Sequence, residues 1–488
     1  MVKDLFRIKS VDSIVIESEK SEHRLKKALS ALDLTALGVG AIIGAGIFAL
    51  TGTAAAGSVD RPGAGPGLIL SFIITGFACG LCALCYAEFA SMIPIAGSAY
   101  TYAYATLGEL IAWIIGWDLI LEYAVGNIGV AISWSGYFME LLRGLGLDAT
   151  NWQWLTVSYN VGYHNPEVVS RAPHLFGIPI IFNLPAFLIV AFITIILVIG
   201  VKESARFNSI MVGIKLLILL FFIVVGTLYV KPQNWHPFAP NGWSGIMTGA
   251  ALVFFAYIGF DAISTTAEEA KNPQRDLPLG MIGSLVICTV LYIATAAVLT
   301  GLIPYTELNT AEPLTKALNY LKLDWAAGIV AVGAVIATTA VLLVFQLGQP
   351  RIFFSMSRDG LLPKRFASVH PRFQTPHFTT ILTGVFVAIP AGFADIAEAA
   401  NLTNIGTLFA FILVSAGVIV LRHKDPDRKR PFRCPWVPVA PLLGIVICLY
   451  LMISLPWVTW VRFAVWLVIG LSIYFGYSRR RSRLNQLQ

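Results

Sequence analysis

Two glycine-containing interruptions of long apolar runs are the features of this chain best suited to chemistry. The first lies in residues 38–48, around Gly44-Ala45-Gly46, and the second in residues 254–261, around Gly259. Backbone at membrane depth cannot leave its N–H and C=O groups facing lipid, so it unwinds only where it lines a protected cavity. Two such breaks at corresponding places in two halves of a chain predict a transporter's substrate site.

The two breaks offer complementary hydrogen-bonding groups. At the first, a helix resuming at Ile47 presents free N–H groups and a positive dipole end, which suit a carboxylate. The small residues Gly44 and Gly46 let a ligand approach the backbone closely, although close helix–helix packing is an alternative explanation of such residues. At the second, carbonyls freed near Ala256 and Ile258 can accept from an ammonium. Together these groups match an α-amino acid.

Charged side chains inside apolar runs are the next candidates. Lys215 lies mid-span, where a lysine costs roughly 2.5–3.5 kcal/mol on insertion scales; the alternative is a lysine snorkelling to the cytoplasmic end. Glu122 and Asp118 lie on one helix face, and Glu122 could extend a proton network or shape the pocket. Asp261 is interpreted as a gating or cation-attracting acid, or else as a solvated acid in a vestibule. For Glu88 a structural ion pair is expected.

Composition places the chain among membrane proteins. Apolar residues make up 57%, charged residues 12%, and mean hydropathy is +0.75; soluble proteins carry about twice that charged fraction. Twelve apolar runs are long enough to cross ~30 Å of hydrocarbon. They are 32–54, 66–90, 106–142, 182–201, 208–230, 245–266, 279–303, 326–352, 376–394, 402–421, 436–454 and 457–477.

The distribution of charge predicts orientation. With the N-terminus in the cytoplasm, most of the 34 Lys and Arg residues fall inside, as the positive-inside rule requires. We therefore expect a multi-pass plasma-membrane protein with both termini cytoplasmic. No signal peptide is evident, and Arg479-Arg480-Arg481 suggests contact with anionic membrane lipids rather than nucleic acid. The cysteines at 79, 82 and 85 lie in an apolar helix without a nearby histidine, which favours packing over metal binding.

The spans predict one all-α membrane domain with internal order. A cytoplasmic tail (1–31) precedes segments 1–5 (32–230) and segments 6–10 (245–421), each set beginning with a broken helix. Because five is odd, the second set enters the membrane from the opposite side, which gives a 5+5 inverted repeat. Segments 11 and 12 (436–477) and a cytoplasmic tail (478–488) follow.

These motifs resemble a known family over about residues 30 to 435. GAIIGAGIF (40–48) is similar to the first-helix motif of the amino acid–polyamine–organocation superfamily. FFAYIGFDAISTTAEE (254–269), AKNPQRDLP (270–278) and GWDLILEY (116–123) resemble its cationic amino acid transporter branch, as do 349–351 and 357–360. The resemblance implies the fold of the bacterial leucine transporter. Twelve spans match the bacterial members, which are proton-driven symporters, whereas animal members have about two more.

The resemblance also implies roles for single residues. The α-carboxylate contacts fall on the backbone of Ile43, Gly44, Ala45 and Gly46, and the ammonium contacts on the carbonyls of Ile42, Phe255, Ala256 and Ile258. Phe255 corresponds to the aromatic residue that covers the substrate, Asp261 to a gating acid, and Phe345 to the side-chain subpocket. Lys215 corresponds to a lysine that replaces Na⁺ in proton-coupled members; its ammonium would reach segment 1 and a hydroxyl of segment 8, Thr338 or Thr339.

The sequence therefore predicts a proton-coupled symporter that takes up L-amino acids by alternating access. Small neutral substrates such as alanine are favoured because Phe345 is bulky, and cationic ones such as arginine are the alternative. The proton is the coupling ion and no cofactor is expected; any accessory protein is unknown. Three rivals stay open: a cationic amino acid exchanger or uniporter, a sodium symporter, which Lys215 argues against, and a polytopic membrane enzyme. We expect no enzymatic activity, since the spans carry no paired-acid metal motif or nucleophile–base pair, and the one histidine within them, His377, stands at the start of its span.

Overall fold

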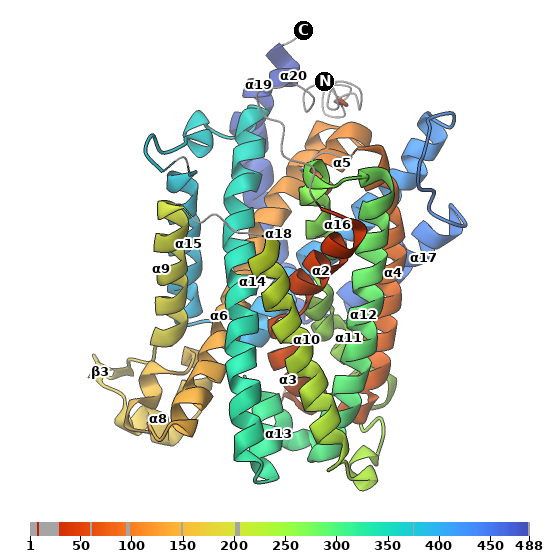
Figure 1. Ribbon diagram of the computed structural model, residues 1–488. Helices are drawn as coiled ribbons and strands as arrows, with labels where there is room; N and C mark the ends of the chain where they lie inside the picture. Colours follow the sequence, from red (N-terminus) through yellow and green to blue (C-terminus); the bar gives the residue numbers. More distant parts are fainter. Residues whose placement is uncertain are drawn as a thin grey trace.

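The computed structural model describes residues 7–8, 29–58, 61–93, 98–147, 150–200, 205–373 and 375–486. Within them the chain is mainly a bundle of long helices (Figure 1). Most of the predicted N-terminal tail, and residues 487–488 of the C-terminal one, lie outside the described residues. The first long helix, α2, begins at Ala31, at the boundary where the predicted tail ends. Ser30 caps this helix: its side chain accepts from the N–H of Asp33, and the Asp33 carboxylate accepts from the N–H of Ser30. This reciprocal capping box fixes the start of the helix.

Eight helical stretches of the described residues are long and apolar enough to cross a membrane. They contain η3 (Gly65–Gly67) with α4 (Leu68–Met92), α6 (Glu109–Gly144), α10 (Ala205–Thr227), α11 (Gly242–Val253) with its continuation, α12 (Pro273–Leu302), α14 (Asp324–Arg358), α16 (Ile396–Lys424), and α18 (Trp457–Ile473) with its continuation. A ninth candidate is the pair α2 (Ala31–Ile42) and η2–α3 (Gly46–Ala56), bent by 42°. Shorter apolar helices are α9 (Leu184–Ile199), α15 (His377–Ala391) and α17 (Val439–Ile453).

Each predicted apolar run coincides with one of these elements. The prediction of a mostly helical, multi-span membrane protein is therefore confirmed, whereas the count of twelve spans depends on the three shorter helices and stays a prediction. α12 begins earlier than the predicted run, at Pro273. Proline is tolerated in the first turn, where its missing N–H would have no intrahelical partner.

The remaining elements are short. Two antiparallel hairpins pair β1 (Gly57–Ser58) with β2 (Arg61–Pro62) and β3 (His174–Leu175) with β4 (Ile178–Pro179). The short helices are α5 (Ser98–Thr106), η4 (Thr150–Leu155), α7 (Tyr159–Tyr163), α8 (Pro166–Arg171), η5 (Pro232–Trp235), η6 (Phe254–Tyr257), η7 (Phe260–Glu269), η8 (Tyr305–Leu308), α13 (Pro313–Tyr320), η9 (Lys364–Ala367), η10 (Tyr474–Ser478), α19 (Arg479–Arg481) and α20 (Arg483–Gln486).

Helix α6 is the centre of the bundle. In its most apolar stretch 89% of the residues are buried, against 28% in α10 and 22% in the stretch containing α18. A helix covered on all sides belongs to the core, and one apolar on its exposed face meets lipid. Because α14 and α16 both pack along α6, residues on these three helices can converge on the broken segments beside them.

Candidate substrate site at two interruptions of helical backbone

The first interruption follows α2. Ile43 is extended, with φ −74° and ψ 101°, and helical backbone resumes at Gly46 as a short π-helical turn. The N–H of Ile43 still bonds to the carbonyl of Val39 at 2.9 Å, and the N–H of Phe48 reaches the carbonyl of Gly44 at 3.3 Å. The predicted carboxylate-binding residues Ile43, Gly44, Ala45 and Gly46 are thus all buried around non-helical or irregular backbone.

The second interruption separates η6 from η7. Ile258 is extended, with ψ 134°, and Gly259 has φ 120°. Only glycine adopts such a φ readily. A Cβ at Gly259 would also lie 3.0 Å from the backbone carbonyl of Ala41, so this glycine lets the second interruption lie directly on α2. The predicted ammonium-binding residues Phe255, Ala256 and Ile258 are buried here.

The two interruptions touch each other. A Cβ on Gly46 would collide with the Cα and N atoms of Ala256, so these backbones are in direct contact. A Cβ on Gly44 would instead meet Cγ2 of Val341 on α14, at 2.9 Å. Segments some two hundred residues apart in the chain therefore form one buried centre, with Gly46 facing backbone and Gly44 facing a side chain.

Tyr292 of α12 joins the two interruptions and was not predicted from the sequence. Its hydroxyl lies 3.0 Å from the carbonyl oxygen of Ile42 and 2.9 Å from that of Ala256. These are two of the carbonyls that the family resemblance assigns to the substrate ammonium. The sequence did offer one signal for this residue, a tyrosine within an apolar span. A buried tyrosine hydroxyl usually needs a hydrogen-bond partner.

Aromatic side chains face glycines of α6 beside these carbonyls. A Cβ on Gly126 would lie 3.1 Å from the ring of Phe345, and one on Gly129 would lie 3.6 Å from the ring of Phe255. The ring centroids of Tyr123 and Phe345 are 5.4 Å apart. Phe255 and Phe345 therefore both lie against the same stretch of α6, and the surroundings of the breaks are aromatic and narrow.

Lys215 of α10 contacts the helix that precedes the first interruption. Its side chain is 1% exposed, and Nζ donates to the carbonyl of Gly40 at 2.6 Å. Within the described part of the chain this is the only hydrogen bond found for its ammonium. The hydroxyl of Thr339 instead accepts from Nε1 of Trp134 at 2.8 Å, and the hydroxyl of Thr338 donates to Ala334 in its own helix. The predicted link from Lys215 to segment 8 is thus not formed in this conformation.

Three acids lie inside the bundle near these elements. Glu122 and Asp261 are each 3% exposed and Asp118 is fully buried, so the solvated interpretation of Asp261 does not fit this conformation. Neither carboxylate oxygen of Asp118 has a hydrogen-bond partner among the described residues. Its carboxylate lies against Gly406, where a Cβ would approach within 2.5 Å. This acid therefore lacks the partners that a buried charge normally requires.

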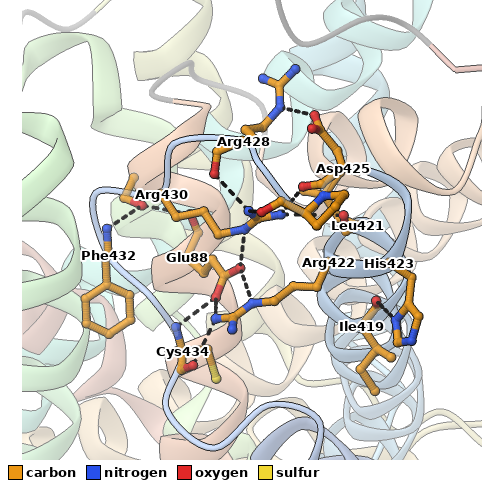
Figure 2. A network of polar contacts seen from close by, with 12 residues as sticks. Glu88, Ile419, Leu421, Arg422, His423, Asp425, Arg428, Arg430, Phe432 and Cys434 are labelled. Atoms are coloured by element: carbon orange, nitrogen blue, oxygen red, sulfur yellow. Dashed lines mark hydrogen bonds and ion pairs between the residues drawn. The ribbon is translucent and has the colours of Figure 1, made fainter.

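A second polar cluster, around Glu88, is closed by hydrogen bonds (Figure 2). Glu88 of α4 accepts from Arg422 at 2.7 and 3.1 Å and from the N–H of Cys434 at 2.8 Å, and its Oε1 lies 3.2 Å from Nε of Arg430. Arg430 also donates to backbone carbonyls, including that of Asp425 at 2.6 Å. The predicted ion pair of Glu88 is confirmed, and it fastens the loop between α16 and α17 to α4.

The amino acid permease family model matches residues 29–476, nearly the whole described bundle. The chain belongs to this family, and is a membrane transporter rather than an enzyme. It is 50% identical to the branched-chain amino acid permease of Bacillus subtilis over 488 residues, covering 100% of both chains. It is also 50% identical to the methylthioribose transporter of the same organism over 485 residues, covering 99% of this chain and 100% of that protein. A vacuolar cationic amino acid transporter 4 of Arabidopsis thaliana is 34% identical over 604 residues, covering 99% and 97%.

Proposed function

We propose that this protein is a proton-coupled symporter that takes neutral L-amino acids into the cell. The observation that carries the proposal is the hydrogen bond from Lys215 to the carbonyl of Gly40. It ties the ammonium of α10 to the helix that ends at the first interruption. Gain and loss of one proton at this lysine would therefore act directly on the backbone that is to bind substrate.

Backbone recognition of the amino acid head group supports this proposal. Extended backbone at Ile43 and at Ile258 leaves N–H and C=O groups outside regular helical bonding. The N–H groups at the start of η2 would take the carboxylate, and the carbonyls of Ile42 and Ala256 would take the ammonium once the hydroxyl of Tyr292 yields them. Recognition through backbone atoms would leave substrate choice to the side-chain surroundings.

The surroundings favour an uncharged substrate side chain. Phe345 and Phe255 face Gly126 and Gly129, so the space beside α6 is bounded by rings. Alanine-sized substrates fit such surroundings, and the relative named as a branched-chain amino acid permease extends the proposal to small aliphatic side chains. A cationic amino acid exchanger is the rival, supported by relatives named as cationic amino acid transporters.

The same proposal includes an architecture. The two interrupted elements would be the first helices of two inverted five-helix repeats, so that α2 to α10 correspond to η6–α11 through α16. The shorter helices α9, α15 and α17 would complete twelve spans in the plasma membrane, with both chain ends in the cytoplasm. Alternating access would then come from motion of the interrupted elements against α6 and α14.

Uptake by proteoliposomes tests this function. Labelled alanine, valine, leucine, arginine and methylthioribose are offered at equal concentration, with and without an imposed inward proton gradient. We expect accumulation of neutral amino acids above equilibrium only with the gradient, accompanied by alkalinisation outside. Gradient-independent counterflow of arginine would overturn the proposal in favour of exchange, and uptake of methylthioribose alone would overturn the substrate class.

A further inference from the structure

The hairpin formed by β3 and β4 carries an unusual residue at its tip. His174 pairs with Pro179 and Leu175 with Ile178, so Phe176 and Gly177 form the two-residue turn. Both have positive φ, 52° and 80°, as in the turns in which asparagine and glycine are preferred. Phenylalanine is an outlier at positive φ. It is 96% exposed, so no packing within the described chain accounts for it.

The apolar character extends beyond the tip. Leu175, Ile178 and Ile180 are 58%, 60% and 43% exposed. Residues 175–201, from the hairpin through the end of α9, contain no charged side chain. In contrast, α8 immediately before the hairpin exposes Glu167 and Ser170, as expected of a surface in water.

The hairpin is fixed beside two helices that expose apolar faces. The N–H of Phe182 bonds to the carbonyl of Trp154, and the N–H of Asn183 bonds to the carbonyl of Gly392 at the end of α15. Figure 1 shows β3 at the edge of the bundle, near the start of α9 and above α8. α9 exposes one row of apolar side chains, Leu188, Phe192, Ile195 and Ile199. In a membrane transporter this row meets lipid, and the apolar side of the hairpin continues it.

Helix length gives a reason for this continuation. α9 has 16 residues and its neighbour α15 has 15. At 1.5 Å per residue α9 covers only ~24 Å, less than the ~30 Å of hydrocarbon in a typical bilayer. An apolar hairpin at the start of α9 makes up the difference. Its backbone is paired internally, and Ile180 bonds to Pro173 at 2.8 Å, so it can lie at the boundary of the hydrocarbon without many unpaired groups.

We propose that the 174–180 hairpin inserts into the boundary between lipid headgroups and acyl chains, with Phe176 as its anchor. It would hold α9 and α15 at a fixed depth while other elements move. The partner is lipid of the leaflet next to α8, and not a second copy of the chain. This proposal concerns the membrane embedding of the protein and does not depend on the substrate or on the coupling ion.

Site-directed spin labelling tests it, and the chain is well suited because its six cysteines are all buried. Phe176→Cys is labelled with a nitroxide and reconstituted into vesicles of phosphatidylcholine and phosphatidylglycerol at a molar ratio of about 3:1. Ser170→Cys on α8 is the matched control. Collision with oxygen, which partitions into lipid, is compared with collision with a water-soluble nickel chelate.

We expect the label at 176 to collide severalfold more with oxygen than with the chelate, and the label at 170 to show the reverse. Equal access of both labels to the chelate would overturn the proposal. So would dipolar coupling between labels at 176 on two molecules, which would mean that a second copy covers the tip. Phe176→Asn distinguishes anchoring from folding: because asparagine suits this turn, the variant should purify normally from detergent. A loss of folded protein would instead assign Phe176 a structural role.

Discussion

The Glu88 cluster and the candidate substrate site differ in how their buried polar groups are paired. Glu88 is surrounded by donors from Arg422, Arg430 and the backbone of Cys434. Around the candidate substrate site, Lys215 makes one hydrogen bond within the described chain, and the carboxylate of Asp118 on α6 makes none. A buried charge with full partners holds one conformation. Groups with few partners can change protonation or partner. We therefore interpret the Glu88 cluster as a fixed connection between elements, and the candidate substrate site as a region that can change conformation.

The largest effect is expected from Lys215→Ala. Without the ammonium, the proton can no longer act on the helix that ends at the first interruption, so gradient-driven accumulation should fall at least ~10-fold, to the passive level. Substrate binding, which uses backbone groups, should persist. Uptake and equilibrium binding are measured on equal amounts of reconstituted protein, with Lys316→Ala on α13 as control. Undiminished accumulation by the Lys215 variant would remove this lysine from coupling and leave Glu122 as the next candidate.

The two glycines of the first interruption allow a matched comparison. Gly46→Ala places a Cβ against the backbone of Ala256, which cannot retreat easily, and should abolish substrate binding. Gly44→Ala meets only the side chain of Val341, so it should weaken binding by about 10-fold and be rescued by Val341→Ala. Binding is measured on protein that elutes as a single species. Equal binding by both alanine variants would contradict a site at this interruption.

Stability should separate the two regions directly. Glu88→Gln leaves two arginines without their carboxylate, and breaking a buried ion pair costs about 3–5 kcal/mol. Asp118→Asn removes no hydrogen bond seen in the described chain and should change the free energy of unfolding by less than about 1 kcal/mol. The free energies of unfolding of both variants are to be measured by thermal unfolding in the same detergent. A larger loss in the Asp118 variant would reverse the comparison, and would mean that its carboxylate is held by contacts of another conformation.

Substrate preference gives a smaller effect. Phe345→Ser withdraws the ring from Gly126 and Tyr123 and should open room for longer side chains. We expect competition by arginine or lysine to strengthen by about 10-fold, in line with the energies of side-chain discrimination. Asp261→Asn in the same background should weaken the cationic competitors more than the neutral ones. An unaltered competition profile would show that Phe345 does not contact the substrate.

The smallest effect concerns pH at the other end of the bundle. Glu312 directly precedes α13, outside the spans. Burial together with nearby Glu140 raises its pKa to about 7, although Arg143 and Lys316 oppose the shift. A carboxyl group with a raised folded pKa stabilises docking while it is protonated. This contribution to stability is lost as pH rises from about 4.5, the ordinary pKa of a glutamate, to about 7, the pKa of Glu312 in the folded protein.

Hydrogen exchange in residues 313–320, corrected for intrinsic rates, should therefore quicken severalfold between about pH 5 and about pH 8. These two pH values lie on either side of the raised pKa of Glu312. Glu312→Gln, which stays neutral, should abolish this dependence. The same dependence in the glutamine variant would assign it to another group.

The sequence was informative where a function depends on the backbone of a local motif. Glycines inside apolar runs located both interruptions, and an acid near the end of a span suggested the ion pair of Glu88. Contacts made by packing could not be predicted in this way. Tyr292, Val341, Gly126 and Gly129 come to the centre from three other helices. The orientation of Thr339 was also out of reach, since successive residues of a helix point about 100° apart.

The hydroxyl of Tyr292 has a consequence for how tightly any substrate can be held. It has one proton to share between the carbonyls of Ile42 and Ala256. An ammonium arriving there would exchange one donor for another, so the net gain per contact would be modest, about 0.5–3 kcal/mol. Departure is eased for the same reason, because the phenol can return as the amino acid leaves. A carrier that must release its cargo on every cycle benefits from a centre that is never left without a donor.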